Sequence, residues 1–457
     1  MSTSAPVISR RALTIGMCTA VVAIAFESIA VATALPAAAS ELNGLRYYAW
    51  AFSTLQVGTL LATVATGRLA DRIGPARPML VGMAVFCVGL VVAATSATML
   101  QLIVGRFVQG LGSGTMGVAV SVCIARVFEP RERPRMFSYI SMAWMLPAFF
   151  GPPVSAWLTA QLGWPWVFWA VLPLVAFAAV MVGPSLRTMM QLPDPISGTA
   201  GSRPPAAMWA AALAAAAVVS LQIAGQRLDW LSLPLLVAGV TLLLVSLPNL
   251  MPVGFFRFGA GLPSVVVVRG LIAGAFFGAE AFIPLMLVEQ RGLSLVLGGV
   301  VLTVGSIGWT TGSWLQSRPG LRLRRDRIIT VGASLVALGL SVAVLTAGVA
   351  SVWVGLIGVS WVLAGLGMGL AFSSTSVAAM SLSPAAEQGR NSSSLALGEA
   401  LGGSLLVGLS GSIFASLHPS GQLPITFGSV MAAMCLLAAL GALLSLRIGR
   451  LPNELSA

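Results

Sequence analysis

Residues 67–80 read GRLADRIGPARPML, and the fold is decided by what this stretch is. One acid, Asp71, lies among Arg68, Arg72 and Arg77, and the chain on either side runs for about twenty residues or more without a charge. Such a cluster fits a surface turn of a soluble protein, and it fits a loop between two membrane-spanning segments equally well. The composition of the whole chain separates these two interpretations.

The composition excludes an ordinary soluble protein. Of the 457 residues, 57% are hydrophobic and 8% are charged, whereas a typical soluble domain carries about 25% charged residues. So few charges cannot cover a water-exposed surface. Because lipid offers no partners for open backbone groups, we predict an all-α polytopic membrane protein.

Charge, cysteine and histidine usage exclude several other classes. The net charge is +12, and all basic residues are arginines, most of them in short loops between apolar runs, so no nucleic-acid partner is expected. Four widely spaced cysteines and one histidine, His418, predict neither a disulfide framework nor a metal site. The chain has no nucleotide-binding P-loop signature and no Ser/His/Asp or Cys/His set. We therefore expect no cofactor, no ATP-driven pump and no enzyme.

The chain contains fourteen apolar segments that are long enough to cross a bilayer, for which about twenty residues suffice. Each segment is expected to be a helix. The segments lie at 13–35, 47–66, 79–97, 99–126, 137–160, 165–184, 207–226, 230–248, 263–288, 295–316, 328–348, 351–377, 391–416 and 424–446.

The arginines orient these segments. If the N-terminus lies inside, the outer loops hold only Arg46, Arg227 and Arg291, and the other loop arginines are cytoplasmic. We therefore predict that both termini are cytoplasmic and that the chain resides in the cytoplasmic membrane. Arginine without lysine, in a chain rich in Ala, Gly and Val, suggests a bacterial source with a GC-rich genome.

The segments divide into two sets of six around an inserted pair. Residues 186–206 are rich in Pro, Gly and Ser and predict a cytoplasmic linker. The next two segments, within 207–250, are rich in Ala, Val and Leu and are joined by a very short turn, so they predict an inserted transmembrane hairpin. The two six-helix halves are then 1–185 and 251–457.

Short strings of glycine recur at matching places in the two halves. Gly110–Gly114 (GLGSG) lies in the fourth segment of the first half, and Gly365–Gly369 (GLGMG) lies in the fourth segment of the second. Such strings are common in membrane helices, because small residues permit close packing. Their matching positions predict duplicated halves, as found in secondary transporters.

Three glutamates lie within apolar segments, where a charged side chain costs roughly 2.5–3.5 kcal/mol. They are Glu27, Glu280 and Glu399. Each is a candidate for proton exchange, because an apolar environment favours the protonated carboxyl. Each is also a candidate for binding a cationic substrate. The alternative is a neutral, hydrogen-bonded side chain that only ties helices together.

Arg106 lies within the fourth segment, where a buried arginine must pair or face water. It would stabilise an ionised carboxylate or hold backbone carbonyls. Gln109 lies one helical turn away, so both side chains are expected to face the same cavity. Arg269 lies nearer a segment end and is expected to extend its guanidinium toward the membrane surface.

The quoted stretch thus becomes the inner loop between the second and third segments. Gly67 and Gly74 are expected to allow a tight turn and a close approach of helices. Asp71, beside Arg72, would cap a helix or pair with an arginine of the other half such as Arg390. Either contact would hold the two halves closed on the inner side.

Three motifs resemble the major facilitator superfamily. Residues 67–74 resemble its loop 2–3 motif in place and spacing, although Pro75 and Ala76 replace the usual basic pair. Residues 106–110 resemble its fourth-span motif. Gly151-Pro152 resembles the core of its fifth-span antiporter motif, in which proline bends the helix.

The span count and the first segment resemble one branch of that superfamily, the fourteen-spanner drug/proton antiporters. Glu27 precedes Ala34-Leu35-Pro36 at the place where the branch has an aspartate. The resemblance implies proton-coupled efflux of hydrophobic or amphiphilic drugs by alternating access, and a link to antibiotic resistance. The expected partners are a small-molecule substrate, protons and the bilayer, and the expected state is a monomer.

Two alternatives remain open. The first is a dedicated exporter of one endogenous product, such as an antibiotic, siderophore or lipid, or an importer, although Gly151-Pro152 favours export. The second is a membrane receptor or assembly protein that transports nothing. Buried carboxylates in both halves argue against this second alternative.

Overall fold

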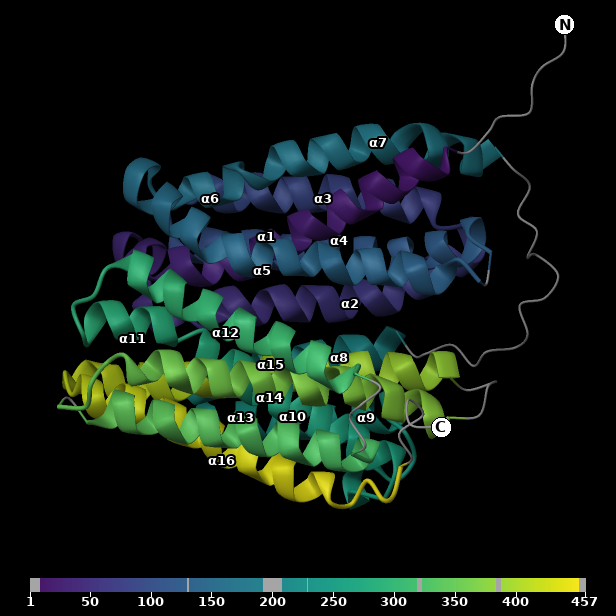
Figure 1. Cartoon of the computed structure of the whole chain (residues 1–457). Helices are drawn as coiled ribbons and strands as arrows, with labels where there is room; N and C mark the ends of the chain where they lie inside the picture. The colour runs from purple at the N-terminus through teal and green to yellow at the C-terminus, as the bar shows by residue number, and fades with distance from the viewer. Residues whose placement is uncertain are drawn as a thin grey trace, which may run out of the picture. The chain divides into compact units, whose positions relative to one another are not determined.

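The computed structural model (Figure 1) describes residues 9–129, 131–191, 208–227, 229–318, 323–349, 351–383 and 388–451. Within these ranges the regular elements are helices, and none is a strand. The helices form two compact units. Unit 1 comprises Met1–Asn43 and Val57–Met208, and unit 2 comprises Gly44–Gln56 and Trp209–Ala457.

Unit 1 is a helical bundle. Its helices are α1 (Arg10–Glu41), most of α2 (Trp50–Ile73), α3 (Ala76–Ala94), α4 (Met99–Val127), α5 (Arg133–Leu162), α6 (Pro165–Trp169) and α7 (Val171–Gln191). Helix α1 packs against α5 and α7, and α3 packs against α4 and α7. Helix α7 continues to Gln191, past the predicted start of the linker at 186, and residues 192–206 of that linker lie outside the described residues.

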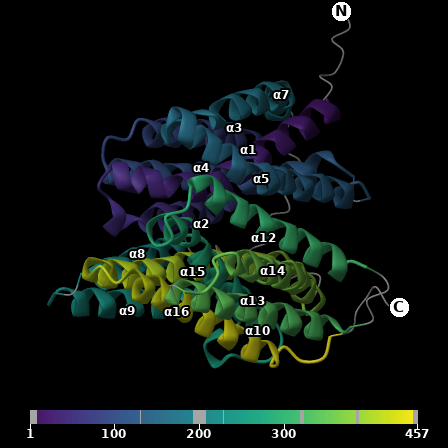
Figure 2. The same cartoon turned by 60° about the vertical axis from the view of Figure 1, so that its left-hand side comes forward.

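Unit 2 is a second helical bundle, whose part from Trp209 onward is drawn in teal, green and yellow in Figure 2. It contains η1 (Leu45–Tyr47), the start of α2, α8 (Met208–Gln226), α9 (Ser232–Leu250), η2 (Phe255–Arg257), α10 (Leu262–Glu280), α11 (Ile283–Glu289), α12 (Leu295–Gln316), α13 (Arg325–Gly348), α14 (Leu356–Ser381), α15 (Gln388–Leu417), η3 (His418–Ser420) and α16 (Leu423–Ser445). Helix α10 packs against α15 and α16, and α13 packs against α14 and α16. These pairings repeat those of unit 1, with α10 in the role of α1 and α13 in the role of α3.

The repeat extends to the register of single glycines. A methyl group added at Gly112 of α4 would lie 2.5 Å from the backbone nitrogen of Phe86 in α3. One added at Gly367 of α14 would lie 2.7 Å from the backbone nitrogen of Val336 in α13. Only glycine permits these approaches. The glycine strings seen in the sequence are therefore equivalent contact surfaces in the two units.

The same equivalence holds where α2 meets α4 and where α12 meets α14. A methyl group at Gly58 would lie 3.0 Å from the backbone nitrogen of Leu111, and one at Gly308 would lie 3.0 Å from that of Leu366. Helices α4 and α14 thus correspond residue by residue along their glycine strings. In this register Trp361 of α14 occupies the place of Arg106 in α4.

A short segment early in the chain folds as part of unit 2. The Tyr48 hydroxyl donates a 2.7 Å hydrogen bond to the backbone oxygen of Ala281, between α10 and α11, and its ring packs against Phe282. The Ser53 hydroxyl lies 2.9 Å from the side-chain oxygen of Gln222 in α8. Helix α2 therefore begins in one unit and continues in the other.

Every predicted segment overlaps a helix, and twelve helical stretches of the described residues are long and apolar enough to cross a membrane. Helices α2 and α5 are not among the twelve, although they contain 24 and 30 residues. The physical reason is composition: α2 ends in a charged stretch, and α5 is rich in polar residues and prolines. The total of fourteen spans stays a prediction.

The glycine contacts predict a contrast within α4. Gly112→Ala should lower the stability of the purified protein by about 1–3 kcal/mol, because the methyl group overpacks the α3–α4 contact. Gly117→Ala is the matched control, since a methyl group there meets nothing within 4 Å and alanine favours helix. Thermal unfolding followed by size-exclusion chromatography measures both. Equal melting temperatures for the two variants would contradict the packing argument.

Candidate functional site

The most deeply buried charges of unit 1 form one ion pair. Glu27 of α1 and Arg106 of α4 are each 1% exposed, and the guanidinium contacts the carboxylate directly. The same guanidinium nitrogen, Nη1, donates a 2.9 Å hydrogen bond to the side-chain oxygen of Gln109, which is fully buried. The structure thus brings together the three residues that the sequence predicted for unit 1.

Close packing of α3 on α4 fixes the arginine and the glutamine. Gly105, beside Arg106, lies against the backbone of Ala93, where a methyl group would approach the Ala93 nitrogen to 2.7 Å. Gly89 of α3 lies against the backbone of Gln109 in the same way, at 2.5 Å. Because neither helix can shift here without opening a backbone contact, the two polar side chains are held in place.

The fifth-span motif faces the same part of α1. Gly151 lies against Phe26, Ile29 and Ala30, at 3.8–4.0 Å from a methyl group added to it. The Ser155 hydroxyl donates a 2.6 Å hydrogen bond to the Ala30 carbonyl. Helix α5 continues through Pro152 and two other prolines from Arg133 to Leu162.

The chemistry of the pair follows from its burial. Each charge compensates the other, and removing one partner of a buried ion pair costs about 3–5 kcal/mol because the other charge stays uncompensated. A proton bound by Glu27 would neutralise the carboxylate and weaken its attraction to Arg106. Gln109 would remain as a hydrogen-bond partner of the guanidinium. The arrangement can therefore couple a proton to the contact between α1 and α4.

The equivalent place in unit 2 carries no such pair. Trp361, which takes the position of Arg106, stacks on Phe276 of α10 with ring centroids 4.8 Å apart and an interplanar angle of 21°. The same two helices of the repeat are thus joined by charge in unit 1 and by aromatic stacking in unit 2. The ionisable side chains of interest in unit 2 are Arg269, Glu280 and Glu399, which lie at other positions.

Arg269, which is buried, and Glu399, which is partly exposed, form an ion pair in unit 2. Two guanidinium nitrogens of Arg269 lie 3.1 and 2.9 Å from one carboxylate oxygen of Glu399. Arg269 is 5% exposed, its Nη1 lies 2.8 Å from the Thr375 hydroxyl, and its guanidinium lies 3.0 Å from the ring centre of Phe372. The expectation that Arg269 extends to the membrane surface is wrong, because α14 and α15 supply buried partners. Glu399 is correspondingly neutralised within the unit.

Glu280 differs from the other two glutamates. It ends α10, next to the break before α11. Among the described residues, no hydrogen-bond donor or cation contacts its carboxylate. Phe276 and Phe277 lie one helical turn before it on the same helix. Both rings contact Trp309, at centroid distances of 5.6 and 6.4 Å.

The aromatic cluster of Phe276, Phe277, Trp309, Trp361 and Phe372 was missed in the sequence. The tryptophans are scattered along the chain and fit interface anchors equally well. The glycine strings offered a sequence signal for Trp361, since aligning the two strings places Trp361 at the position equivalent to Arg106. Phe277, Trp309 and Phe372 are partly exposed, whereas Phe276 and Trp361 are buried, and Glu280 lies one helical turn after Phe277 on α10.

Residues 67–73 of the loop 2–3 motif form the end of α2, and Gly74 begins the short connection to α3. Gly74 adopts a positive φ of 76°, which favours glycine. At Gly67 an added methyl group would meet nothing within 4 Å, and the expected close approach of helices at this residue stays a prediction. Arg72 is exposed. The side chains of Asp71 and Arg390 lie outside the described residues, and their predicted contact stays a prediction.

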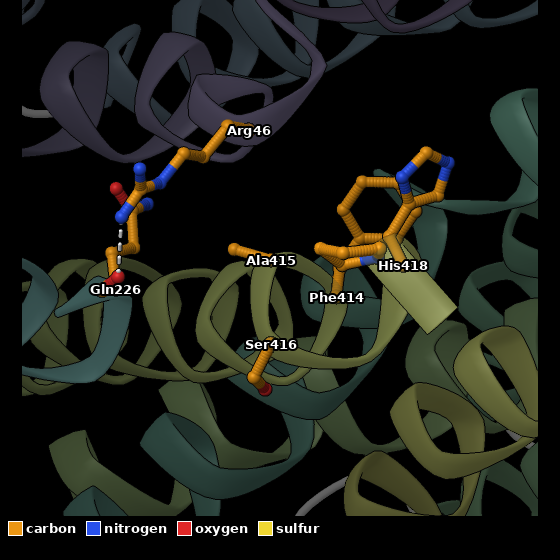
Figure 3. A pocket seen from close by; sticks show the side chains of 7 residues that line it. Arg46, Gln226, Phe414, Ala415, Ser416 and His418 are labelled. Atoms are coloured by element: carbon orange, nitrogen blue, oxygen red, sulfur yellow. Dashed lines mark hydrogen bonds between the residues drawn. The ribbon is translucent and has the colours of Figure 1, made fainter. Parts of the chain in front are cut away.

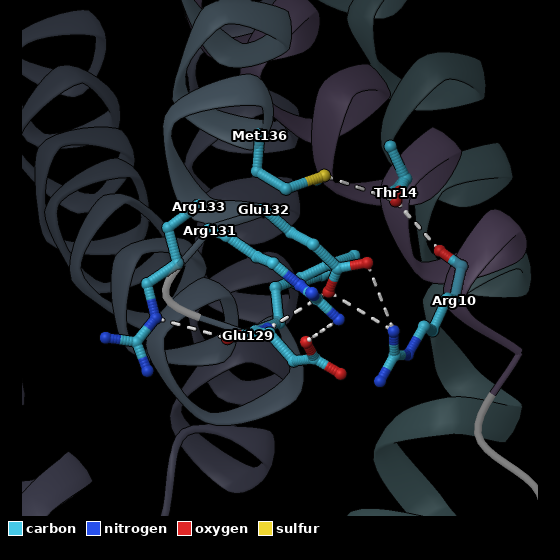
Figure 4. A network of polar contacts seen from close by, with 8 residues as sticks. Arg10, Thr14, Glu129, Arg131, Glu132, Arg133 and Met136 are labelled. Atoms are coloured by element: carbon cyan, nitrogen blue, oxygen red, sulfur yellow. Dashed lines mark hydrogen bonds and ion pairs between the residues drawn. The ribbon is translucent and has the colours of Figure 1, made fainter.

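A polar network joins the start of α1 to the loop between α4 and α5 (Figure 4). Arg10 pairs with Glu132 at 3.2 Å, and Glu132 accepts a 3.0 Å hydrogen bond from the backbone nitrogen of Glu129. Arg133 donates to the carbonyls of Phe128 and Ala125 at the end of α4. These contacts hold the loop between α4 and α5 against the start of α1. Their charged groups are far more exposed than the Glu27–Arg106 pair.

Comparisons with known proteins agree with this architecture. A family model described as Major Facilitator Superfamily matches residues 15–407. An uncharacterised MFS-type transporter of Mycobacterium tuberculosis is 25% identical over 286 residues, which cover 59% of this chain and 40% of that protein. The chain thus spans about two-fifths of the length of that relative.

Two further relatives carry more specific names. Multidrug resistance protein 3 of Bacillus subtilis is 24% identical over 332 residues, covering 69% of this chain and 62% of that protein. The Acurin A biosynthesis cluster MFS-type transporter of Aspergillus aculeatus is 25% identical over 235 residues, covering 51% and 38%.

Solved structures share the fold. A peptide transporter POT superposes with a TM-score of 0.68 at 15% identity, covering 96% of this chain and 95% of that one. A D-xylose–proton symporter superposes with a TM-score of 0.65 at 12% identity, covering 94% and 97%. At these identities the likeness is one of fold.

The buried pair of unit 1 predicts strong coupling in a double-mutant cycle. Arg106→Gln should destabilise the protein by about 3–5 kcal/mol, because it leaves the Glu27 carboxylate without its cation. The double variant Glu27→Gln/Arg106→Gln should lose clearly less than the sum of the single losses. Thermal unfolding measures the cycle.

The exposed Arg10→Gln serves as the control and should change stability by about 1 kcal/mol or less. Strictly additive losses for Glu27→Gln and Arg106→Gln would show that the two side chains do not interact.

Proposed function

This chain belongs to the major facilitator superfamily, and we propose that it exports hydrophobic or amphiphilic compounds, drugs among them, in exchange for protons. The observation that carries the proposal is the buried Glu27–Arg106 pair. We further propose fourteen spans with both termini in the cytoplasm, so that units 1 and 2 contain the two halves of an alternating-access transporter in the cytoplasmic membrane. It would act as a monomer.

In this proposal Glu27 is the proton carrier. With Glu27 ionised, its pair with Arg106 holds α1 to α4. When a proton binds the Glu27 carboxylate, the charge on that side chain disappears and this hold weakens. Ser155 of α5 donates a hydrogen bond to the α1 backbone at Ala30. A shift of α1 would therefore displace α5, which carries Gly151 and Pro152. Protonation would in this way bias the unit between two arrangements.

Substrate would be held chiefly by unit 2. The aromatic cluster supplies apolar and π surface, and aromatic faces attract cations. Glu280 adds a carboxylate that contacts no cation among the described residues. Glu399 is less suited to this role, because Arg269 already neutralises it. An amphiphile with one positive charge suits this arrangement best, and the similarity to a multidrug resistance protein supports the same class.

A dedicated exporter of one endogenous product remains the second candidate. The similarity to a transporter of a fungal biosynthesis cluster favours it. The two candidates share the proton coupling and differ in the range of substrates. A panel of unrelated lipophilic compounds separates them, because a dedicated exporter would move only one chemical class.

Proton coupling predicts a clear result in inside-out membrane vesicles. An acidic interior should drive accumulation of a lipophilic dye in vesicles that contain the protein, and collapsing the pH gradient with an ionophore should stop it. Glu27→Gln should reduce the gradient-driven uptake at least tenfold while downhill exchange of labelled substrate continues. Uptake that survives both the ionophore and Glu27→Gln would refute the coupling.

The exposed Glu129→Gln is the matched control, since it makes the same chemical change outside the membrane-spanning segments and should leave uptake unchanged.

The substrate arrangement predicts a charge-selective defect. Glu280→Gln should weaken transport of a monocationic dye roughly tenfold and leave a neutral dye of similar size nearly unaffected, since a lost ionic contact is worth about one power of ten. Competition assays in the same vesicles measure both dyes. A parallel loss for the cationic and the neutral dye would show that Glu280 does not select charge.

A further inference from the structure

Unit 2 holds an apolar cavity of about 540 Å³ among α8, α9 and α15. Its wall is formed mainly by leucines, among them Leu221, Leu233, Leu236, Leu405 and Leu409. All three helices belong to stretches that are long and apolar enough to cross a membrane. Leu233, Leu236 and Leu409 are exposed, so the cavity opens on a surface that hydrocarbon chains of the bilayer would contact.

Tight contacts on either side of α8 hold this cavity in shape. Gly239 of α9 lies against Leu221, where a methyl group would approach the side chain to 2.6 Å, and Gly408 of α15 lies against Gln222. Gln222 is 5% exposed and donates a 3.2 Å hydrogen bond to the Ser404 carbonyl of α15. The inserted hairpin is therefore anchored to α15 along one edge and leaves the leucine-lined space beside it.

A second cavity of about 340 Å³ lies at the ends of α8 and α15 (Figure 3). Gly225 and Ser412 line the apolar cavity, and the residues that follow them on the same helices, Gln226 and Phe414, line the second. Arg46 and His418 complete this second wall. The two cavities thus lie near each other at these helix ends, and the second has the polar side chains of Arg46 and His418 in its wall.

The charges at this end favour an anion. The Arg46 guanidinium donates a 2.9 Å hydrogen bond to the Gln226 carbonyl, and no carboxylate of the described residues forms an ion pair with it. His418 and Glu289 pair with each other at 3.2 Å, and Arg227 and Asp229 pair at 3.7 Å. Among the residues that line this second cavity, Arg46 carries the permanent charge, which is positive.

We propose that these two cavities form one site for an anionic phospholipid of the surrounding membrane. An acyl chain lies in the leucine-lined cavity among α8, α9 and α15, and the phosphate of the headgroup contacts Arg46. Basic pockets between membrane helices bind anionic headgroups through such contacts. Because Gln222 also bonds Ser53 of α2, the lipid would stabilise the α8 contact with the first turns of α2.

Native mass spectrometry of the full-length protein in detergent tests this site, with phosphatidylglycerol and phosphatidylcholine of identical acyl chains as probes. The unmodified protein should retain the anionic lipid roughly five- to tenfold better than the zwitterionic one, and lose that preference at high salt. Arg46→Gln should abolish the preference, and Arg46→Lys should keep most of it. Arg257→Gln, an exposed arginine of unit 2 away from the cavities, should behave as the unmodified protein.

Leu236→Trp tests the apolar half of the same site. Filling the cavity should lower retention of both lipids, while size-exclusion chromatography shows the variant folded. The adduct mass identifies the occupant, and inorganic phosphate alone should not raise the melting temperature. Equal retention of the two lipids by the unmodified protein, or an unchanged preference in Arg46→Gln, would overturn the proposal. Lipid retention is read without transport, so failure here leaves the exporter proposal untouched.

Discussion

Backbone contact at glycines holds the helices of both units together. In lipid, two apolar helices gain little from the hydrophobic effect when they pair, so close packing and polar contacts have to supply the attraction. Gly112 and Gly367 provide that packing at equivalent places, each against a backbone nitrogen of the neighbouring helix. The candidate site depends on it, because Gly89 and Gly105 fix the part of α4 that carries Arg106 and Gln109.

One scaffold, used twice, carries two kinds of chemistry. In unit 1 the contact between the first and fourth helices of the repeat is an ion pair, Glu27 with Arg106. In unit 2 the corresponding helices meet through Phe276 and Trp361. A charge pair responds to a proton and a ring stack does not. In the proposed exporter, unit 1 would therefore respond to protons and unit 2 would supply aromatic rings to the substrate.

Much of the fold was predictable from the sequence because its signals are local. Apolar runs bounded by arginines placed the helices, and the glycine strings indicated the duplication. The Glu27–Arg106 pair was partly predictable, since each is an isolated charge that needs a partner in hydrocarbon. The Arg269–Glu399 pair was not, because its partners lie 130 positions apart and only the packing of α10 on α15 brings them together. The prediction that the Arg269 guanidinium extends toward the membrane surface was wrong for that reason.

The segment Gly44–Gln56 has a consequence for the order in which the protein matures. Chains leave the ribosome N-terminus first, and domains usually fold in that order. Tyr48 and Ser53, however, find their partners at Ala281 and Gln222, which are synthesised much later. The first turns of α2 must therefore wait in the translocation machinery or the lipid until α8 and α10 arrive. Unit 2 therefore combines a segment translated near the start of the chain with helices translated after those of unit 1.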